Sequence, residues 1–561
     1  MAAHEPVKSG EDAVAQVGER QAVVVRTFES PSWPFDHLAF AAIVLILAIA
    51  GATFADYGVS WDEGEHQAYG ETVFQYYATW FEERAAVEWK PLYQYGAAFD
   101  LTAVLLQFVL PFEPYHTRHL LNVLIGVVGL FGCWRLARLV GGPRAGLIAV
   151  LLLAATPNFY GHMFNNPKDI PFAVGTVWSL YFMVQLLRVL PRPPGSLVVK
   201  LGVVIGLTLG VRIGGLLLLG YLGLALGGWL LFLSPRRHPT DLIRHGALVA
   251  VRVVVPVVVI AYGIMLAYWP WAQQEPFTNP LRALTEFSHH AFPYKVLFFG
   301  DYIAADQLPW SYLPLHFVLK LPELSVLALL LGGPWAVLYY WRRQRWGSLA
   351  QVLPIGLILF AALFPLLYAM AIKAIVFNGM RHFLFVVPPL CMIAALTIDG
   401  ALDRLKQVRW RGAIGTAVAA YVAWHVQTMV ALHPYQYVYY NEFVGGLDGA
   451  VGELETDYWA NTYAEAVEEL VGYLSAAYGE NFEKRKFRIA VCGPPTSATA
   501  NFPNNFEWVK DVGEADYFIA FTKDNCNELI EGRDVVRVER LDVVLAVVKD
   551  CKVARHALIP Q

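Results

Sequence analysis

The sequence predicts a polytopic α-helical membrane protein of about eleven spans, ending in a small α/β domain. Of the 561 residues, 57% are hydrophobic and only 16% are charged, and the mean hydropathy is +0.44. Soluble domains are typically about 45–50% apolar and about 25% charged. Long apolar runs recur along the chain, and the composition turns polar from about residue 432. A formal net charge of −4 gives no basis for nucleic-acid binding.

The spans are predicted from the apolar runs, because a helix needs about 20 mostly apolar residues to cross a bilayer. The runs that meet or nearly meet this length are 37–55, 119–139, 144–158, 170–190, 197–212, 213–233, 246–269, 320–341, 350–372, 382–399 and 411–431. The residues before the first run lack the short basic-then-apolar pattern of a cleaved signal peptide, so 37–55 is expected to be a retained helix.

Basic clusters in alternate loops predict the orientation of these spans. They are Arg135/Arg138/Arg144, Arg188/Arg192/Lys200, Arg236/Arg237/Arg244, Arg342/Arg343/Arg345 and Arg404/Lys406/Arg409/Arg411. The positive-inside rule places these loops in the cytoplasm, together with residues 1–36. The transmembrane core at 37–431 then has outer loops at 56–118 and 270–319, and the domain at 432–561 is extracytoplasmic.

Residues 96–112 are apolar but short, and they contain Asp100. We therefore expect a helix at the outer membrane interface, not a further span. In the tail, 463–478 has helical periodicity, and 487–492, 516–522 and 535–548 have the patterns of strands. Cys492, Cys526 and Cys551 lie in the same tail and allow one disulfide.

Under this topology, ionisable side chains gather at the outer ends of the spans. Charged groups at membrane depth are costly, roughly 2.5–3.5 kcal/mol at the bilayer centre, and are functional candidates by default. The candidates are Asp62, Glu63, Lys90, His162, Lys168, Asp169, Arg212, Lys373 and Arg381. Carboxylates that face cations at a membrane surface suit a reaction on a negatively charged lipid headgroup.

The carboxylates also have a structural interpretation. Asp62 and Glu63 could begin a helix with Ser60 as its cap, and Asp169 could begin the helix near Pro171. The cations have structural interpretations as well: Lys90 could extend to the interface, and Arg212 and Arg381 could anchor helix ends. His162 could be a structural hydrogen-bonding group.

No nucleotide-binding or hydrolase motif occurs in a fitting context. The pair His289–His290 has no partner at metal-ligand spacing. The sequence therefore indicates no cofactor; a divalent metal is compatible with it but is not indicated.

Four short motifs resemble those of one enzyme family. They are Trp61-Asp62-Glu63-Gly64, Lys90-Pro91-Leu92-Tyr93, Asn166-Pro-Lys-Asp-Ile-Pro171 and Asn378-Gly-Met-Arg-His-Phe-Leu-Phe-Val-Val-Pro388. In type and order these motifs resemble those of the C-type integral-membrane glycosyltransferases. The nearest branches are the protein O-mannosyltransferases and the lipid A aminoarabinose transferases.

The resemblance implies a sugar donor on a polyprenyl phosphate, used at the extracytoplasmic face, with transfer by inverting single displacement. The acceptor would be a lipid, a glycan or a protein, and the location a bacterial inner membrane. Carried over by motif, Asp62 is the general base and Glu63 and Asp169 support it. The implied phosphate ligands are Lys90, Lys168, Arg212 and Arg381. Candidate substrate contacts are His66, Tyr93, His162 and His382.

A membrane transporter or lipid flippase is the alternative, because it too would need charged groups along a substrate pathway. Such proteins usually place these groups near the bilayer midplane and show internal repeats. The sequence shows no repeat, and its candidates lie toward one face. A membrane scaffold whose tail binds partners is a third reading, which leaves the outer charges unexplained.

Overall fold

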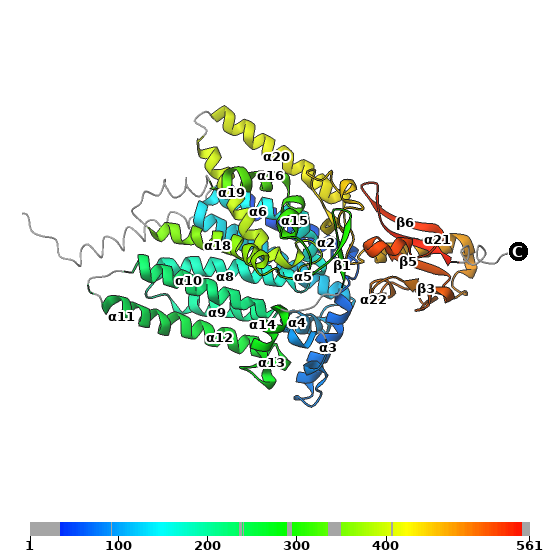
Figure 1. Cartoon of the computed structure of the whole chain (residues 1–561), viewed down its shortest axis with the longest axis horizontal. Coiled ribbons are helices and arrows are strands. Elements are labelled where there is room, and N and C mark those ends of the chain that lie inside the picture. The colour runs from blue at the N-terminus through cyan, green and yellow to red at the C-terminus, as the bar shows by residue number, and fades with distance from the viewer. Residues whose placement is uncertain are drawn as a thin grey trace, which may run out of the picture.

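The computed structural model describes residues 34–90, 92–234, 238, 240–288, 294–334, 349–404 and 408–551. It shows a bundle of long helices with a small sheet-containing domain at one end (Figure 1). The predicted fold class, a polytopic helical membrane protein with a C-terminal α/β domain, is confirmed.

The first half of the bundle is built from consecutive helices. Their bounds are α2 Phe35–Thr53, α3 Glu63–Ala78, α4 Ala98–Gln107, α5 Pro114–Gly141, α6 Pro143–Ala154, α7 Pro157–Asn165, α8 Asp169–Val189, α9 Gly195–Leu209 and α10 Leu216–Phe232. Helix α5 packs against both α6 and α8, and α8 is largely buried. These helices carry the predicted outer-loop residues at their ends.

The second half adds further helices and a short hairpin. The elements are α11 Thr240–Val249, α12 Val255–Ala267, α13 Pro270–Gln274, α14 Asn279–Ser288, β1 Lys295–Phe298, β2 Asp301–Ala304, α15 Tyr312–Lys320, α16 Glu323–Leu327, α18 Leu349–Ala371, α19 Val387–Arg404 and α20 Val408–Ala431. A 3₁₀ turn, Arg381–Val386, leads into α19, whose middle is buried in the bundle.

In the described part of the chain, seven helices are long and apolar enough to cross a membrane, or eight if the bent pair α6–α7 counts as one span. The expectation of about eleven also counted 197–212, where α9 is shorter, and 411–431, which lies within α20. The expected span 320–341 extends into residues outside the described ranges, as do most of residues 1–36.

Helix α4 explains why the apolar run at 96–112 does not cross the bundle. Its 10 residues extend over about 15 Å, half of a hydrocarbon core of about 30 Å. Asp100 lies in its first turn and is buried against α3 and α5. The helix is thus held by a polar anchor at one end of the bundle.

The C-terminal domain contains a five-stranded sheet in the order β4-β3-β5-β7-β6. Its elements are α21 Tyr463–Tyr478, β3 Phe487–Val491, α22 Pro495–Thr499, β4 Phe506–Trp508, β5 Tyr517–Phe521, β6 Arg533–Arg540 and β7 Val543–Asp550. Strand β3 pairs in parallel with β4 and β5, whereas β7 pairs antiparallel with β5 and β6. A disulfide joins Cys492 to Cys526.

Helix α21 has the bounds that its periodicity predicts, but the expected strand at 535–548 is a hairpin. Leu541 and Asp542 both have positive φ angles, of 51° and 63°. A two-residue turn of this kind matches the twist of paired strands. Strand β4 was not predicted, because its three residues are too few to show a periodicity.

The C-terminal domain packs directly on the segment before α3. The Trp61 ring contacts Phe521 with 6.1 Å between centroids. A Cβ on Gly493 would lie 2.9 Å from the Trp61 ring, and one on Gly64 would lie 2.9 Å from Thr496. Only glycine permits these close approaches. The domain therefore covers the end of the bundle where Asp62 lies.

Candidate active site

Four chain segments meet at this end of the bundle, and each brings its charged residue to the start or end of a helix. Asp62 precedes the first turn of α3, and Asp169 is the first residue of α8. Arg212 lies between α9 and α10, and Arg381 begins the turn before α19. The helix ends, where the chain turns at the bundle surface, thus converge on one place.

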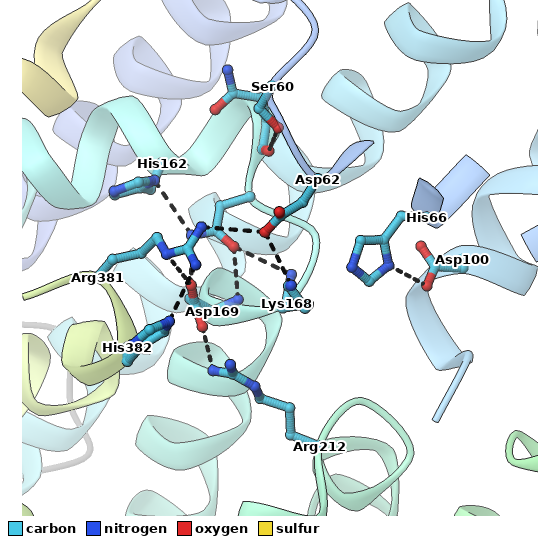
Figure 2. A network of polar contacts seen from close by, with 12 residues as sticks. Ser60, Asp62, His66, Asp100, His162, Lys168, Asp169, Arg212, Arg381 and His382 are labelled. Atoms are coloured by element: carbon cyan, nitrogen blue, oxygen red, sulfur yellow. Dashed lines mark hydrogen bonds and ion pairs between the residues drawn. The ribbon is translucent and has the colours of Figure 1, made fainter. Parts of the chain in front are cut away.

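Figure 2 shows these side chains in contact, and we call Asp62, Lys168, Asp169, Arg212 and Arg381 the charge cluster. Oδ2 of Asp62 accepts hydrogen bonds from Nζ of Lys168 at 3.0 Å and from Nη1 of Arg381 at 3.2 Å. Asp169 pairs with Arg212 through one oxygen, and its other oxygen lies 3.8 Å from Nε of Arg381. Arg381 therefore bridges the two carboxylates.

Three cations surround two carboxylates, so the charge cluster carries an excess positive charge. Burial alone would raise the pKa of Asp62, but the charges of Lys168 and Arg381 outweigh it and hold the pKa well below its usual range. Asp62 is therefore ionised at neutral pH. Such a site attracts an anion.

Asp62 has one oxygen that is not used. Both cations bind Oδ2, and within the described ranges Oδ1 has no hydrogen-bond or ion-pair partner. The Asp62 side chain is 23% exposed, whereas that of Asp169 is only 2% exposed. Of the two carboxylates, Asp62 is the one that can receive an incoming hydroxyl.

Neighbouring polar and aromatic groups hold the charge cluster in place. Asn166 donates to Oδ2 of Asp169 at 2.9 Å and accepts from the Asp169 backbone N–H at 2.9 Å, which starts α8. The ring of Tyr95 lies 5.4 Å from Nζ of Lys168, and the ring of Trp459 lies 4.7 Å from the Arg381 guanidinium carbon. Cation–π contacts of this kind fix a cation's position.

Glu63 follows Asp62 in sequence but points elsewhere. Its side chain is buried, accepts from the backbone N–H of Ser60 at 2.8 Å, and lies 3.1 Å from Nε2 of His119 on α5. The helix α3 has Asp62 as its N-cap and no side-chain cap hydrogen bond, and the Ser60 hydroxyl donates to the backbone carbonyl of Asn165 instead of capping the helix. Glu63 thus ties the turn before α3 to α5 and has no contact with the charge cluster.

A second buried network lies beside the charge cluster. Nδ1 of His66 is 2.8 Å from Oδ2 of Asp100, and Nη2 of Arg118 is 2.6 Å from Oδ1 of the same carboxylate. Both oxygens of Asp100 are thus occupied, and the three side chains are almost fully buried. His66 is four residues after Asp62, so the two lie on the same side of the first turn of α3.

The other predicted contacts fall into two groups. His382 lies 3.1 Å from Nη2 of Arg381 and is part of the site. His162 lies next to the site, with Nε2 3.0 Å from the Tyr458 hydroxyl and Nδ1 3.3 Å from the Asn166 amide nitrogen. Tyr93 packs against Trp271 and is not in contact with the charge cluster.

Lys90 is exposed and has no ion pair or hydrogen bond within the described ranges. It lies five residues before Tyr95, which contacts the charge cluster, so a chain of that length keeps it within about 18 Å.

No group of three or more His, Cys, Asp or Glu side chains that could hold a metal ion is found in the part of the chain that the structure describes. His289 and His290 lie outside those residues.

Tyr95, Asn166 and Trp459 are site residues that sequence reasoning did not single out as contacts. Asn166 begins the motif at 166–171, and its place three residues before Asp169 is a cap signal that could have identified it. Tyr95 follows the Lys90 motif by two residues. Trp459 lies in the polar tail, and no pattern in the sequence connects it with Arg381.

A family model supports the resemblance inferred from the motifs. Residues 117–260 match the model described as dolichyl-phosphate-mannose-protein mannosyltransferase. The matched segment contains Lys168, Asp169 and Arg212, whereas Asp62 and Arg381 lie outside it. The resemblance to the C-type membrane glycosyltransferases, in the branch of the protein O-mannosyltransferases, is thereby confirmed.

Solved structures of membrane glycosyltransferases show a distant likeness. ArnT from Cupriavidus metallidurans bound to undecaprenyl phosphate is 14% identical, with 93% of this chain and 99% of that chain covered and a TM-score of 0.48. The Archaeoglobus fulgidus oligosaccharyltransferase is 12% identical, with 88% and 70% covered and a TM-score of 0.45. No curated protein matches the chain at a significant level.

Proposed function

We propose that this protein transfers a sugar from a polyprenyl-phosphate carrier to an acceptor hydroxyl, at the extracytoplasmic face of a bacterial inner membrane. The observation that carries the proposal is the charge cluster, which joins excess positive charge to a carboxylate with an open oxygen. The excess positive charge suits the phosphate of a donor lipid, and the open carboxylate oxygen suits the acceptor hydroxyl. The matched family model supports the donor class.

The cations act on the phosphate. Lys168 and Arg212 are partly exposed beside Asp62 and Asp169, at 11% and 20% of their side chains, so a phosphate can reach them. Lys90 is exposed and unpaired among the described residues, which leaves its ammonium available for an incoming anion. As the bond to the sugar breaks, the leaving phosphate gains charge, and fixed cations are most effective where charge develops.

Asp62 acts on the acceptor. The acceptor hydroxyl gives its proton to Oδ1 of Asp62, and the hydroxyl oxygen forms a bond to the anomeric carbon. The bond from that carbon to the phosphate oxygen breaks, and its electron pair leaves with the polyprenyl phosphate. Because attack and departure occur on opposite faces of the sugar, the anomeric configuration inverts. Asp169 holds Arg212 and Arg381 in position and does not contact the acceptor.

The test is transfer from a lipid-linked sugar donor by the purified protein. Asp62→Asn preserves the size of the side chain and removes the base, so turnover should fall at least about 10²-fold. Asp56→Asn is the matched control, because Asp56 lies in the same segment, is 50% exposed and pairs only with His433 among the described residues. This control should keep the activity of the unmodified protein.

Unimpaired turnover by Asp62→Asn would refute the role of Asp62. Movement of the intact donor lipid across vesicles without any glycosylated product would favour the transporter or flippase alternative.

A further inference from the structure

His66 has one ring nitrogen that the described network leaves unused. Nδ1 faces Asp100 at 2.8 Å, whereas Nε2 is buried and has no hydrogen-bond partner. The His66 side chain is only 2% exposed. A buried polar atom without a partner calls for an explanation; the described residues contain others of this kind, Nδ1 of His119 among them. Figure 2 shows the Nε2 edge of the ring turned toward Asp62 and Lys168, away from Asp100.

The contacts of Asp100 determine which nitrogen carries the proton. An ionised carboxylate only accepts hydrogen bonds, so Nδ1 must donate to it, and in the neutral ring Nε2 then carries the lone pair. Arg118 binds the other oxygen of Asp100 at 2.6 Å and holds the carboxylate in place. His66 is therefore arranged as a base: Asp100 orients its ring, and the free nitrogen Nε2 is directed at Asp62.

We propose that His66, oriented by Asp100, is the final acceptor of the proton that the acceptor hydroxyl releases to Asp62. This inference rests on the proposed function and extends it from one residue to a relay. His66 acts through Asp62, because its own buried ring is out of reach of a substrate.

The electrostatics of Asp62 explain why a relay is needed. Lys168 and Arg381 hold the pKa of Asp62 well below its usual range despite burial, so protonated Asp62 is a strong acid. A general base is most effective when its pKa lies near the operating pH. Imidazole is the side chain that ordinarily exchanges protons near neutral pH, and a carboxylate on Nδ1 stabilises the imidazolium.

The steps balance without any further reactant. The hydroxyl O–H bond breaks as the oxygen attacks the sugar, and the proton is bound by Asp62 while the phosphate leaves. Nε2 has no hydrogen-bond partner in the described network, so the proton reaches it from Asp62 through one water molecule, which is not consumed. Asp62 is ionised again beside Lys168 and Arg381, and Asp100 faces the new imidazolium. His66 later returns the proton to solvent by the same path, through Asp62.

The charged groups around His66 come from four elements. Asp100 lies on α4 and Arg118 on α5, while Asp62 precedes α3 and Lys168 precedes α8. Because the relay requires neutral His66, the rate of transfer should fall as the pH is lowered.

The experiment compares pH–rate profiles of transfer by the purified full-length protein with a lipid-linked sugar donor. His66→Gln should lower kcat by about 10²-fold, leave the KM for the donor within about twofold, and remove the fall in rate at acid pH. Asp100→Asn should change the pH–rate profile, since it removes the carboxylate that orients Nε2 of His66 toward Asp62. His119→Gln is the matched control, a buried histidine paired with Glu63, and should keep the fall at its original pH.

The outcomes separate the relay from the proposed function. If Asp62→Asn is inactive while His66→Gln keeps the original kcat and profile, the relay is wrong and the proposed function stands. If Asp62→Asn is fully active, both are wrong. If His66→Gln fails to bind donor lipid, the pH–rate profile of Asp100→Asn tests the relay instead. A profile identical to that of the unmodified protein would overturn the relay.

Discussion

The two ends of the bundle use the same types of charged residue in different ways. At the end opposite the charge cluster, Arg138 of α5 binds both oxygens of Asp36 on α2, at 2.7 and 2.8 Å. Arg144 of α6 pairs with Asp399 and Asp403 of α19. We call these contacts the opposite-end ion pairs. Arg381 and Asp399, 18 residues apart along α19 and its leading turn, are separated by about 27 Å.

The two ends differ in the ratio of cations to carboxylates and in whether a carboxylate oxygen is open to an incoming group. At the opposite end each arginine is matched to carboxylates on a neighbouring helix, so the pairs tie α2 to α5 and α6 to α19. In the charge cluster the cations outnumber the carboxylates, and one oxygen of Asp62 is open. An ion pair is therefore informative about function only when it leaves charge or hydrogen-bonding capacity unused.

Replacing Arg381, which bridges both carboxylates, should have the largest effect on activity. Arg381→Gln should lower kcat/KM at least about 10²-fold, since one fixed donor at a developing charge contributes that much. Transfer kinetics from the lipid-linked donor measure it. A loss below threefold would show that the bridge is structural, like the opposite-end ion pairs.

Arg144→Gln should lower the stability of the protein and leave its activity unchanged. Breaking its pairs leaves Asp399 buried without this cation, which should lower the free energy of unfolding by about 1–3 kcal/mol. Thermal melting in detergent measures the loss, and activity per folded molecule should be unchanged. A specific loss of activity in the folded protein would make the opposite end part of the catalytic machinery.

Trp459→Leu should have a smaller effect, because the ring acts only through Arg381. Loss of a partly desolvated cation–π contact is worth about 1 kcal/mol, or roughly fivefold in affinity. The affinity for donor lipid should weaken by that factor, with kcat changed less. An effect as large as that of Arg381→Gln would mean that Trp459 contacts the substrate directly.

The smallest expected effect concerns the pH dependence of stability: the difference in melting temperature between Asp62→Asn and the unmodified protein should hardly change with pH. Asp62 has a lowered pKa, so the stability from its ionised form is fully present above the unfolded pKa, about 3.9, and is lost only as pH falls through the folded pKa. The melting difference between Asp62→Asn and the unmodified protein should stay constant from pH 8 to about pH 5 and narrow only below about pH 4. Narrowing near pH 6 would show that the cations do not hold the Asp62 pKa low.

The sequence predicted the parts of the fold that depend on local pattern. Helix α21 and the long buried helices follow from periodicity and length, and the C-terminal domain from the change in composition. The hairpin of β6 and β7 was missed because its turn residues, Leu541 and Asp542, are not the usual glycine or asparagine. Turn geometry is set there by strand pairing, which local sequence does not show.

For the site, the ordered motifs predicted which segments matter but not how each side chain points. Asp62 and Arg381 are 319 residues apart and are in contact. Adjacent helical residues diverge by about 100°, so Asp62 and Glu63 face different neighbours. The contacts of Trp459 with Arg381 and of Asp100 with His66 depend on tertiary packing between distant segments, and no spacing rule could have predicted them.

The charge cluster should bind a lipid-linked phosphate, whereas the opposite-end ion pairs should not. Equilibrium binding of polyprenyl phosphate to Lys168→Gln and to Arg144→Gln measures this difference. Lys168→Gln should weaken binding at least about tenfold, and folded Arg144→Gln should bind like the unmodified protein. Equal affinities for all three proteins would contradict it.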